Sequence, residues 1–173
     1  TCGKDVGWLD PQMPGWPYYD KQNGFDIWEN QYYIPLGFSY DYYITRTEYE
    51  QSVSESLRHL LLLKAVVVED EDAGNWEGIL QHLNLDGVSY TEAAYYKDCL
   101  DRRAVSCGPF SRDNSGFTAQ ITTGEERLVF FSGPWESGWS AAVNGPPAEV
   151  EKVKEGFMGG RVPAGARTIR LTY

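Results

Sequence analysis

Residues 128–173 decide the fold, and they read LVFFSGPWESGWSAAVNGPPAEVEKVKEGFMGGRVPAGARTIRLTY. The stretch opens with four apolar residues, too few for a helix of normal length and rich in β-formers, so we expect a strand buried on both faces. A second strand is expected at residues 139–143, because they run into Asn144-Gly145, which supplies the two positive-φ positions of a tight hairpin turn. Apolar–polar alternation over 168–173 predicts a final strand. The stretch is therefore expected to form a β-rich unit of short strands and tight turns.

Helices are expected upstream of this unit. Residues 47–64 carry apolar side chains at three- and four-residue spacing, and Thr47 and Glu50 have the spacing of a capping box that would start the helix. A second capping box, Ser89-x-x-Glu92, precedes a helix expected over residues 92–103. A short helix is also expected over residues 76–83.

The order of strands, helices and strands predicts the α+β class. We expect an antiparallel β-sandwich or jelly-roll-like C-terminal part, with two or three helices inserted between N-terminal strands, at 25–29 and 38–44, and the C-terminal strands. A single α+β domain is expected over residues 25–173, with its β-rich core at 110–173. Residues 1–24 are dense in Gly, Pro and aromatic residues, and are expected to form an irregular arm.

The charge balance excludes one class of partner. Fifteen basic and twenty-five acidic residues give a formal net charge of −10. A protein that binds nucleic acid neutralises phosphates with Lys and Arg, so we expect no nucleic-acid partner. The longest apolar run, residues 60–68, is interrupted by Lys64 and is too short to span a membrane.

The sequence carries no motif that predicts a cofactor. Nucleotide-binding loops and the G-x-S-x-G nucleophile elbow do not occur, so no cofactor is expected and no catalytic residue is assigned. The two histidines lie far apart in sequence, which does not suit a zinc site. The acidic run at residues 69–72 lacks the spaced ligands and central Gly of a calcium loop, and we expect a solvated turn there.

The three cysteines leave two alternatives open. Cys99 and Cys107 are close enough in sequence for a local disulfide, which would leave Cys2 unpaired and would suit an extracytoplasmic protein. Buried free thiols explain the same pattern.

Aromatic residues are the candidate ligand-binding groups, because exposed rings of this kind stack on sugars. The candidates are Trp16, Tyr19 and Trp135, together with Glu136 beside the last of these. A purely structural role for Trp135 is the competing interpretation. Trp139 begins an expected strand and is interpreted as a core anchor.

Carboxylates offer a different hypothesis. A glycoside hydrolase needs two carboxyl groups in one cleft. Asp20, Asp41 and Glu136 lie near aromatic clusters in the sequence and are the first candidates for such a pair.

Several short motifs, taken in order, resemble those of the YfhO-like bacterial membrane proteins. They are ENxxYIPLGF at 29–38, GFTA at 116–119, LVFFSGP at 128–134, GWSAAVNG at 138–145, GFM at 156–158 and VPAG at 162–165. Each motif alone is weak, whereas their joint order over residues 25–173 is fairly specific. One departure is Gly159-Gly160, where family members commonly carry an apolar pair, and it predicts a bulge or a close backbone approach.

The resemblance implies a domain of a larger protein. It implies a soluble, β-rich domain on the extracytoplasmic face of the bacterial cell membrane, excised here from a polytopic protein. The family resembles integral-membrane glycosyltransferases that use lipid-linked sugars, and it is associated with decorating cell-envelope polymers. In such enzymes the catalytic acid lies in an external loop near the first membrane helix, and this sequence contains no such segment. The implied partners are the membrane-embedded remainder of the polypeptide and a glycan or lipid-linked sugar.

Three functions therefore stand as hypotheses. The leading one is a non-catalytic external domain that supports or recognises a glycan or a lipid-linked sugar. The second is a free-standing carbohydrate-binding module that uses Trp16, Tyr19 or Trp135, and the third is a glycoside hydrolase.

Overall fold

The computed structural model describes residues 15–153 and 156–173. The chain divides into two compact units, Thr1–Tyr33 and Ile34–Tyr173, which are described separately. Cys2 and the first part of the expected aromatic arm lie outside the described residues.

The described part of the first unit is built around a β-hairpin. Strand β1 (Tyr18–Gln22) pairs antiparallel with β2 (Phe25–Trp28). The turn residues Asn23 and Gly24 have φ values of 52° and 79°, the conformation that a two-residue hairpin loop requires. Residues 18–22 were expected to be irregular, and they form a strand because this turn brings them beside β2.

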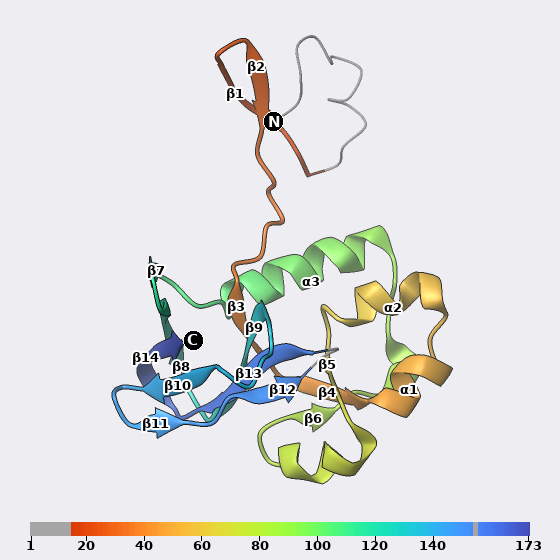
Figure 1. The fold of residues 1–173 in the computed structure, drawn as a ribbon. Helices are drawn as coiled ribbons and strands as arrows, with labels where there is room; N and C mark the ends of the chain where they lie inside the picture. The colour runs from red at the N-terminus through yellow and green to blue at the C-terminus, as the bar shows by residue number, and fades with distance from the viewer. Residues whose placement is uncertain (1–14, 154–155) are drawn as a thin grey trace. The chain divides into compact units, whose positions relative to one another are not determined.

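The second unit has the predicted α+β class, with its helices inserted between N-terminal and C-terminal strands (Figure 1). Its first half contains β3 (Gly37–Tyr40), β4 (Tyr42–Thr45), α1 (Arg46–Gln51), α2 (Glu55–Leu61), β5 (Val66–Val68), the 3-10 helix η2 (Asp70–Trp76), β6 (Gln81–His82), the 3-10 helix η3 (Leu85–Gly87) and α3 (Glu92–Ala104). Its second half contains β7 (Phe110–Asp113), β8 (Gly116–Thr123), β9 (Arg127–Pro134), β10 (Ser140–Val143), β11 (Pro147–Ala148), β12 (Glu151–Val153), β13 (Phe157–Val162) and β14 (Gly165–Thr172).

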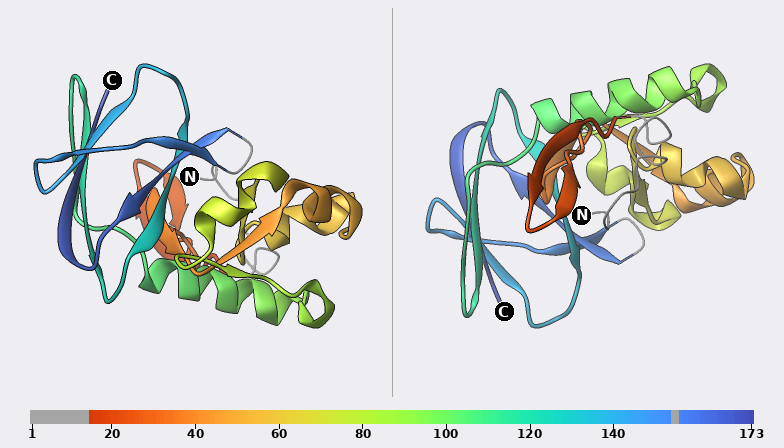
Figure 2. Two further views of the ribbon diagram at one scale, coloured as in Figure 1. Left: turned by 90° about the horizontal axis from the view of Figure 1, so that it is seen from below. Right: turned by 90° about the horizontal axis from the view of Figure 1, so that it is seen from above.

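Two antiparallel sheets form the expected sandwich. One has the strand order β11-β10-β14-β8-β7 and the other β12-β13-β9-β3. Ala119, Ile169 and Leu171 from the first sheet pack with Val129 and Phe131 from the second in one buried cluster. Figure 2 shows these strands gathered at one end of the unit, with α1 and α2 at the other.

Strand β9 is buried on both faces, as predicted. Val129 and Phe131 face the sandwich core, whereas Leu128 and Phe130 belong to a second cluster on the opposite side of the sheet. All four side chains are almost completely inaccessible to solvent. The second cluster also contains Phe38 and Tyr40, so β3 packs beside β9 in this core.

A small parallel sheet covers the second face of the sandwich sheet, and the sequence did not predict it. Its strand order is β5-β4-β6, and β4 pairs parallel with both neighbours. Val66 and Val68 face the cluster that contains Leu128, while Val67 packs on the other side with Leu61 and neighbouring helical residues. The run expected as one strand over 38–44 is divided between two sheets.

The helices differ from the sequence-based boundaries. The single helix expected over 47–64 is two short helices, α1 and α2, because the chain breaks at residues 52–54. The capping box consists of Thr45 and Glu48 rather than Thr47 and Glu50. Helix α3 occupies nearly the predicted range.

The caps and the acidic run also differ from their expected positions. Thr91, rather than Ser89, caps α3 by accepting a hydrogen bond from the Ala94 amide at 3.3 Å. Residues 76–83 were expected to form a helix, but only Trp76 is helical, as the last residue of η2, and Gln81–His82 form β6. Residues 70–72, within the run expected as a solvated turn, begin η2.

The two described cysteines do not form the local disulfide. Both Cys99 and Cys107 are free and buried. Cys99 lies on α3, whereas Cys107 belongs to the sandwich core, where its sulfur lies close to Gly37. Burial raises the pKa of Cys107 to about 12. The structure therefore supports buried free thiols rather than a local disulfide, because the two cysteines pack in different parts of the unit despite their short separation in sequence.

The turn predictions at the C-terminal end are confirmed. Asn144 and Gly145, with φ values of 53° and 104°, join β10 to β11. Gly160 lies where an added Cβ would come within 3.1 Å of the Glu149 carbonyl oxygen, which is the close backbone approach that the Gly-Gly pair predicts. Among the residues that the structure describes, no helix is long and apolar enough to cross a membrane.

The double burial of β9 gives a first prediction. Replacing Leu128, which is fully buried, with Ala should lower the free energy of unfolding by about 2–5 kcal/mol because it leaves a cavity between two packed layers. The matched control is Leu100→Ala on α3, where the leucine is 50% exposed, and its effect should stay below about 0.5 kcal/mol. Denaturant unfolding of both variants measures the difference, and equal losses would contradict this account of β9.

The position of the capping box gives a second prediction. Glu48 accepts hydrogen bonds from the Thr45 amide at 2.9 Å and from His82 at 2.8 Å, so Glu48→Ala should cost about 1 kcal/mol of stability. Glu50→Ala removes only an exposed ion pair with Arg46 and should cost less than about 0.5 kcal/mol. Thermal unfolding of the two variants would give the opposite order if Glu50 were the capping residue.

The Glu48 contribution should also depend on pH. Partial burial acts to raise the pKa of Glu48, but the hydrogen bonds from His82 and Thr45 outweigh it, so the net shift is downward. A lowered folded-state pKa means that this stabilisation is present at neutral pH and is lost as the pH falls below about 4. The stability difference between the native protein and Glu48→Ala should therefore shrink in acid.

Candidate functional site

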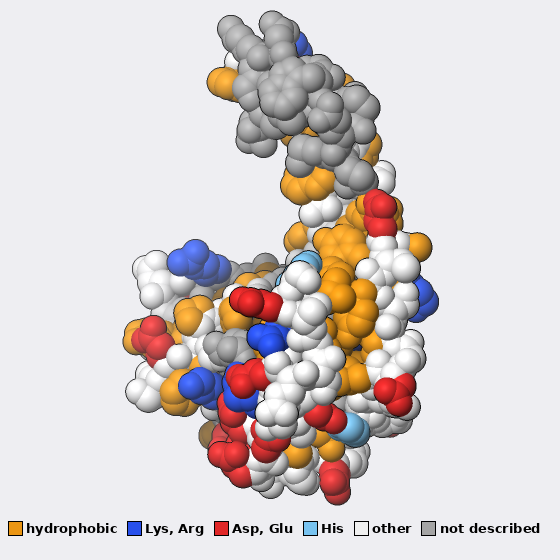
Figure 3. Space-filling view, turned by 90° about the vertical axis from the view of Figure 1, so that its right-hand side faces the viewer, with side chains coloured by type: hydrophobic (Ala, Val, Ile, Leu, Met, Phe, Trp, Pro, Cys, Tyr) orange, Lys and Arg blue, Asp and Glu red, His pale blue; other side chains and the backbone are white. Residues whose placement is uncertain are grey.

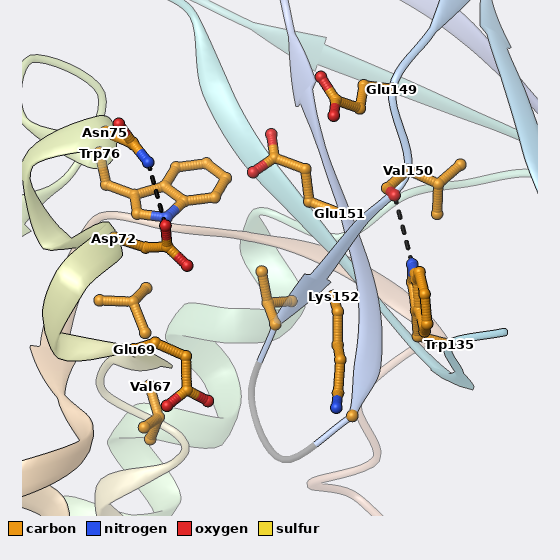
Figure 4. Close-up of a pocket in the computed structure, with 13 residues that line it drawn as sticks. Val67, Glu69, Asp72, Asn75, Trp76, Trp135, Glu149, Val150, Glu151 and Lys152 are labelled. Carbon is orange, nitrogen blue, oxygen red and sulfur yellow. Dashed lines mark hydrogen bonds between the residues drawn. The ribbon is translucent and has the colours of Figure 1, made fainter. Parts of the chain in front are cut away.

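A cleft of about 510 Å³ opens in the second unit between η2 and β12 (Figure 4). One wall comes from the end of β5 and from η2, and the other from β12 and the two residues before it. Trp135, at the end of β9, closes one side. The cleft therefore lies where the edge strand of the sandwich sheet approaches the first half of the unit.

Two indole rings line the cleft, and they differ in accessibility. Trp76 is only 3% exposed and lies in the core, with the Arg161 guanidinium 4.9 Å from its ring centre. Trp135 is half-buried, and its Nε1 donates a hydrogen bond to the Val150 carbonyl at 3.3 Å. This bond fixes the ring against the residues that precede β12. Because Trp135 is the more accessible of the two indoles, it is the one that a ligand could contact.

Carboxylates dominate the charge of the lining. Four of them, on Glu69, Asp72, Glu149 and Glu151, line the cleft together with a single ammonium group, on Lys152. In Figure 4 the Lys152 side chain extends along the wall opposite Glu69.

Individual partners hold two of these carboxylates. Glu69 accepts hydrogen bonds from the Arg46 guanidinium at 2.8 and 2.9 Å, which lower its pKa. Asp72 accepts one from the Asn75 amide at 3.2 Å. These bonds fix the positions of the Glu69 and Asp72 carboxylates in the lining of the cleft.

Glu151 is the lining carboxylate with a raised pKa. Burial is the largest cause, and the nearby charges of Glu149 and Asp72 act in the same direction. The Arg161 guanidinium, 3.4 Å away, opposes the shift without cancelling it. Arg161 also donates to the Asn75 carbonyl at 2.7 Å, so it links β13 to η2.

The structure brings one of the four predicted binding residues into this cleft. Trp135 lines it, whereas the adjacent Glu136 accepts a hydrogen bond from the Tyr173 hydroxyl at 2.6 Å and is not part of the lining. Trp16 and Tyr19 belong to the first unit, Trp16 half-buried and Tyr19 exposed. Their part in sugar binding stays a prediction.

Trp139 packs as a core residue. Its ring lies 6.1 Å from that of Phe117 and 5.2 Å from that of Tyr173, and it packs against the sandwich core.

The carboxylates first considered for hydrolysis do not line the cleft. Asp41 is held by Arg102, at 3.2 Å, and by Arg127. Asp20 accepts hydrogen bonds from the Lys21 amide and the Gln22 side chain within β1. Sequence proximity to aromatic residues did not place these groups in this cavity.

Sequence reasoning missed most of the cleft. Trp76 and residues 149–152 were not singled out, and residues 69–72 were interpreted only as a turn. Residues 149–153 read Glu-Val-Glu-Lys-Val and show no regular apolar–polar alternation, so the sequence offered no periodic signal for this edge strand. Their meeting with η2 depends on contacts between residues about eighty positions apart. Within the described parts of the chain, no group of three or more potential ligands could hold a metal ion.

The fold and the cleft define an α+β domain built on a β-sandwich, with an acidic cleft at one sheet edge. A family model described as "Bacterial membrane protein YfhO" matches residues 80–173, which is more than half of the chain. The chain therefore belongs to the YfhO family. The matched region includes α3 and every sandwich strand except β3. No curated protein and no solved structure matches the chain.

The raised pKa of Glu151 gives a third prediction. A carboxyl whose folded-state pKa lies above its unfolded value favours folding most in its protonated form, so this contribution is lost as the pH rises. The stability of the native protein relative to Glu151→Gln should therefore decline as the pH rises from about 4 to about 6. Urea unfolding across this range measures the difference, with Glu125→Gln as an exposed control. An increase with pH would show that Arg161 lowers the pKa of Glu151 overall.

Proposed function

We propose that this chain is a non-catalytic extracytoplasmic domain of a polytopic YfhO-family protein, and that it recognises or supports a glycan or a lipid-linked sugar. The observation that carries the proposal is the η2–β12 cleft, in which a fixed indole stands beside several hydrogen-bond acceptors. Family membership supports a parent protein in the membrane.

The lining suits a sugar for a physical reason. A pyranose ring presents an apolar face of C–H groups and an edge of hydroxyl groups, so it needs an aromatic surface and fixed polar partners together. Trp135 offers the surface, and the carboxylates of Glu149 and Glu151 offer acceptors for hydroxyl donors. Hydrogen bonds to charged groups are stronger than those between neutral groups.

Binding of soluble glycans tests the proposal. Oligosaccharides from bacterial cell-envelope polymers should bind the 173-residue chain in calorimetry, and Trp135→Leu should weaken binding about tenfold or more, because one stacked ring contributes on the order of 1–2 kcal/mol. Glu151→Gln should weaken binding with little change in fold. The control is Trp139→Leu, which removes a half-buried indole outside the cleft and should leave affinity unchanged where the variant remains folded by circular dichroism.

Two results would contradict the proposal. Equal weakening by the Trp135 and Trp139 variants would indicate a general effect on stability. Absence of binding across envelope glycans and short-chain lipid-linked sugars would remove the cleft as a sugar site.

Glycoside hydrolysis is the second candidate, and one observation favours it. Glu151 combines a raised pKa with the nearby carboxylates of Glu149 and Asp72, and a general acid needs such an environment. The same oligosaccharides should then release new reducing ends, and Glu151→Gln should abolish the release. Binding without release supports the non-catalytic function.

A further inference from the structure

The first unit presents a concentration of exposed aromatic rings. Four of the ten large apolar side chains that are exposed in the described parts of the chain lie within residues 15–33. They are Tyr18, Tyr19, Phe25 and Tyr33, with exposed fractions of 52%, 65%, 45% and 53%. Three of them lie on β1 and β2, which together with their turn, residues 18–28, are called the aromatic hairpin.

The aromatic hairpin is held in one conformation by contacts within the first unit. The Tyr18 and Trp28 rings meet edge to face with centroids 5.5 Å apart, and Lys21 pairs with Asp26 at 3.4 Å across the strands. The Glu29 amide donates to the Pro17 carbonyl at 3.1 Å, and the Gln31 amide to the Gly15 carbonyl at 2.9 Å. A two-stranded hairpin is marginal in water without such additions. The exposed rings are therefore presented by an ordered segment.

The chemistry of these rings suits a membrane surface. Three of the four are tyrosines, which have an apolar body and a hydroxyl tip, and such side chains concentrate where hydrocarbon meets water at a membrane surface. Asp20, Lys21, Asp26 and Glu29 lie in the same segment, so the hairpin cannot enter the hydrocarbon. Shallow contact at the level of the lipid headgroups satisfies both the rings and the charges.

We propose that the aromatic hairpin docks at the lipid–water interface of the membrane that holds the parent protein. The chain belongs to a family of bacterial membrane proteins, so the parent protein is expected to lie in a bilayer. For this reason we propose a lipid surface rather than a protein partner. Docking would hold the domain beside lipid-borne ligands. The inference stands independently of sugar binding in the cleft, because it rests on other residues.

The charge of the segment distinguishes this mode from electrostatic adsorption. Three carboxylates and one ammonium give residues 15–33 a formal charge of −2, and the whole chain carries −10. Anionic lipids therefore offer no attraction, and the contact depends on the rings. We expect binding to neutral phosphatidylcholine at least as strong as binding to mixtures with phosphatidylglycerol, and little loss of binding at high salt.

Vesicle sedimentation with the 173-residue chain tests the proposal. The protein should partition onto phosphatidylcholine vesicles, and Tyr19→Ser combined with Phe25→Ser should lower the partition coefficient about tenfold or more. The matched control combines Tyr173→Ser with Leu100→Ser, which removes side chains of similar exposure, 64% and 50%, from the second unit and should leave partitioning unchanged. Circular dichroism and thermal unfolding verify that both variants fold.

Each alternative result overturns the proposal. Absence of binding to phosphatidylcholine, or equal losses in the two double variants, would show that the hairpin rings are not the contact. Binding confined to anionic vesicles would show electrostatic adsorption. The protein could instead self-associate without binding vesicles, and the Tyr19→Ser, Phe25→Ser double variant could abolish that association. This result would show that the aromatic hairpin pairs with a second copy of the chain. Trp135→Leu should bind vesicles like the native protein, so a failure here is separable from a failure of the cleft proposal.

Discussion

The burial of β9 on both faces is the constraint on which the second unit depends. A strand with apolar side chains on both sides has no face to offer to water, so it is stable only between two packed layers. The five-stranded sheet supplies one layer, which packs against Val129 and Phe131 of β9. The parallel sheet supplies the other layer, which packs against Leu128 and Phe130. Figures 1 and 2 show the resulting order, with strands of the five-stranded sheet on one side of β9 and the helical half on the other.

A buried cation ties the helical half to the central sheet. Arg102 on α3 is 7% exposed, and its guanidinium donates to the Ser39 carbonyl and to Asp41. It also lies 5.3 Å from the ring of Tyr40, whose hydroxyl donates to the Leu62 carbonyl. Burial raises the pKa of Tyr40, so the phenol remains neutral and a donor. A buried Arg is tolerated because hydrogen bonds from its terminal nitrogens, an ion pair and an aromatic face replace most of its hydration, while its buried Nε has no hydrogen-bond partner among the described residues.

The cleft is a consequence of the same layering. It forms where β12, at the edge of the central sheet, meets η2 from the opposing layer, and Arg161 joins the two through Glu151 and the Asn75 carbonyl. Charged side chains on an edge strand discourage pairing with other chains, and here the same residues line a cavity. Figure 3 shows that acidic side chains are frequent on the helical side of the molecule as well, with basic ones among them. An acidic surface of this kind repels polyanions.

The sequence by itself determined the features that depend on neighbouring residues. Asn144-Gly145 specified a hairpin turn because both residues tolerate positive φ, and the apolar run at 128–131 specified a strand without a wet face. The α+β class and the YfhO family followed from the order of such segments. Tertiary structure decided which layers flank β9 and that β4 pairs in parallel with β5 and β6. It also decided that Thr45 rather than Thr47 caps α1, and that Cys99 and Cys107 stay apart. It alone brought Trp76, Trp135 and Glu151 to one cleft, because contacts between distant residues are set by the packing of whole layers and leave no local pattern in the chain.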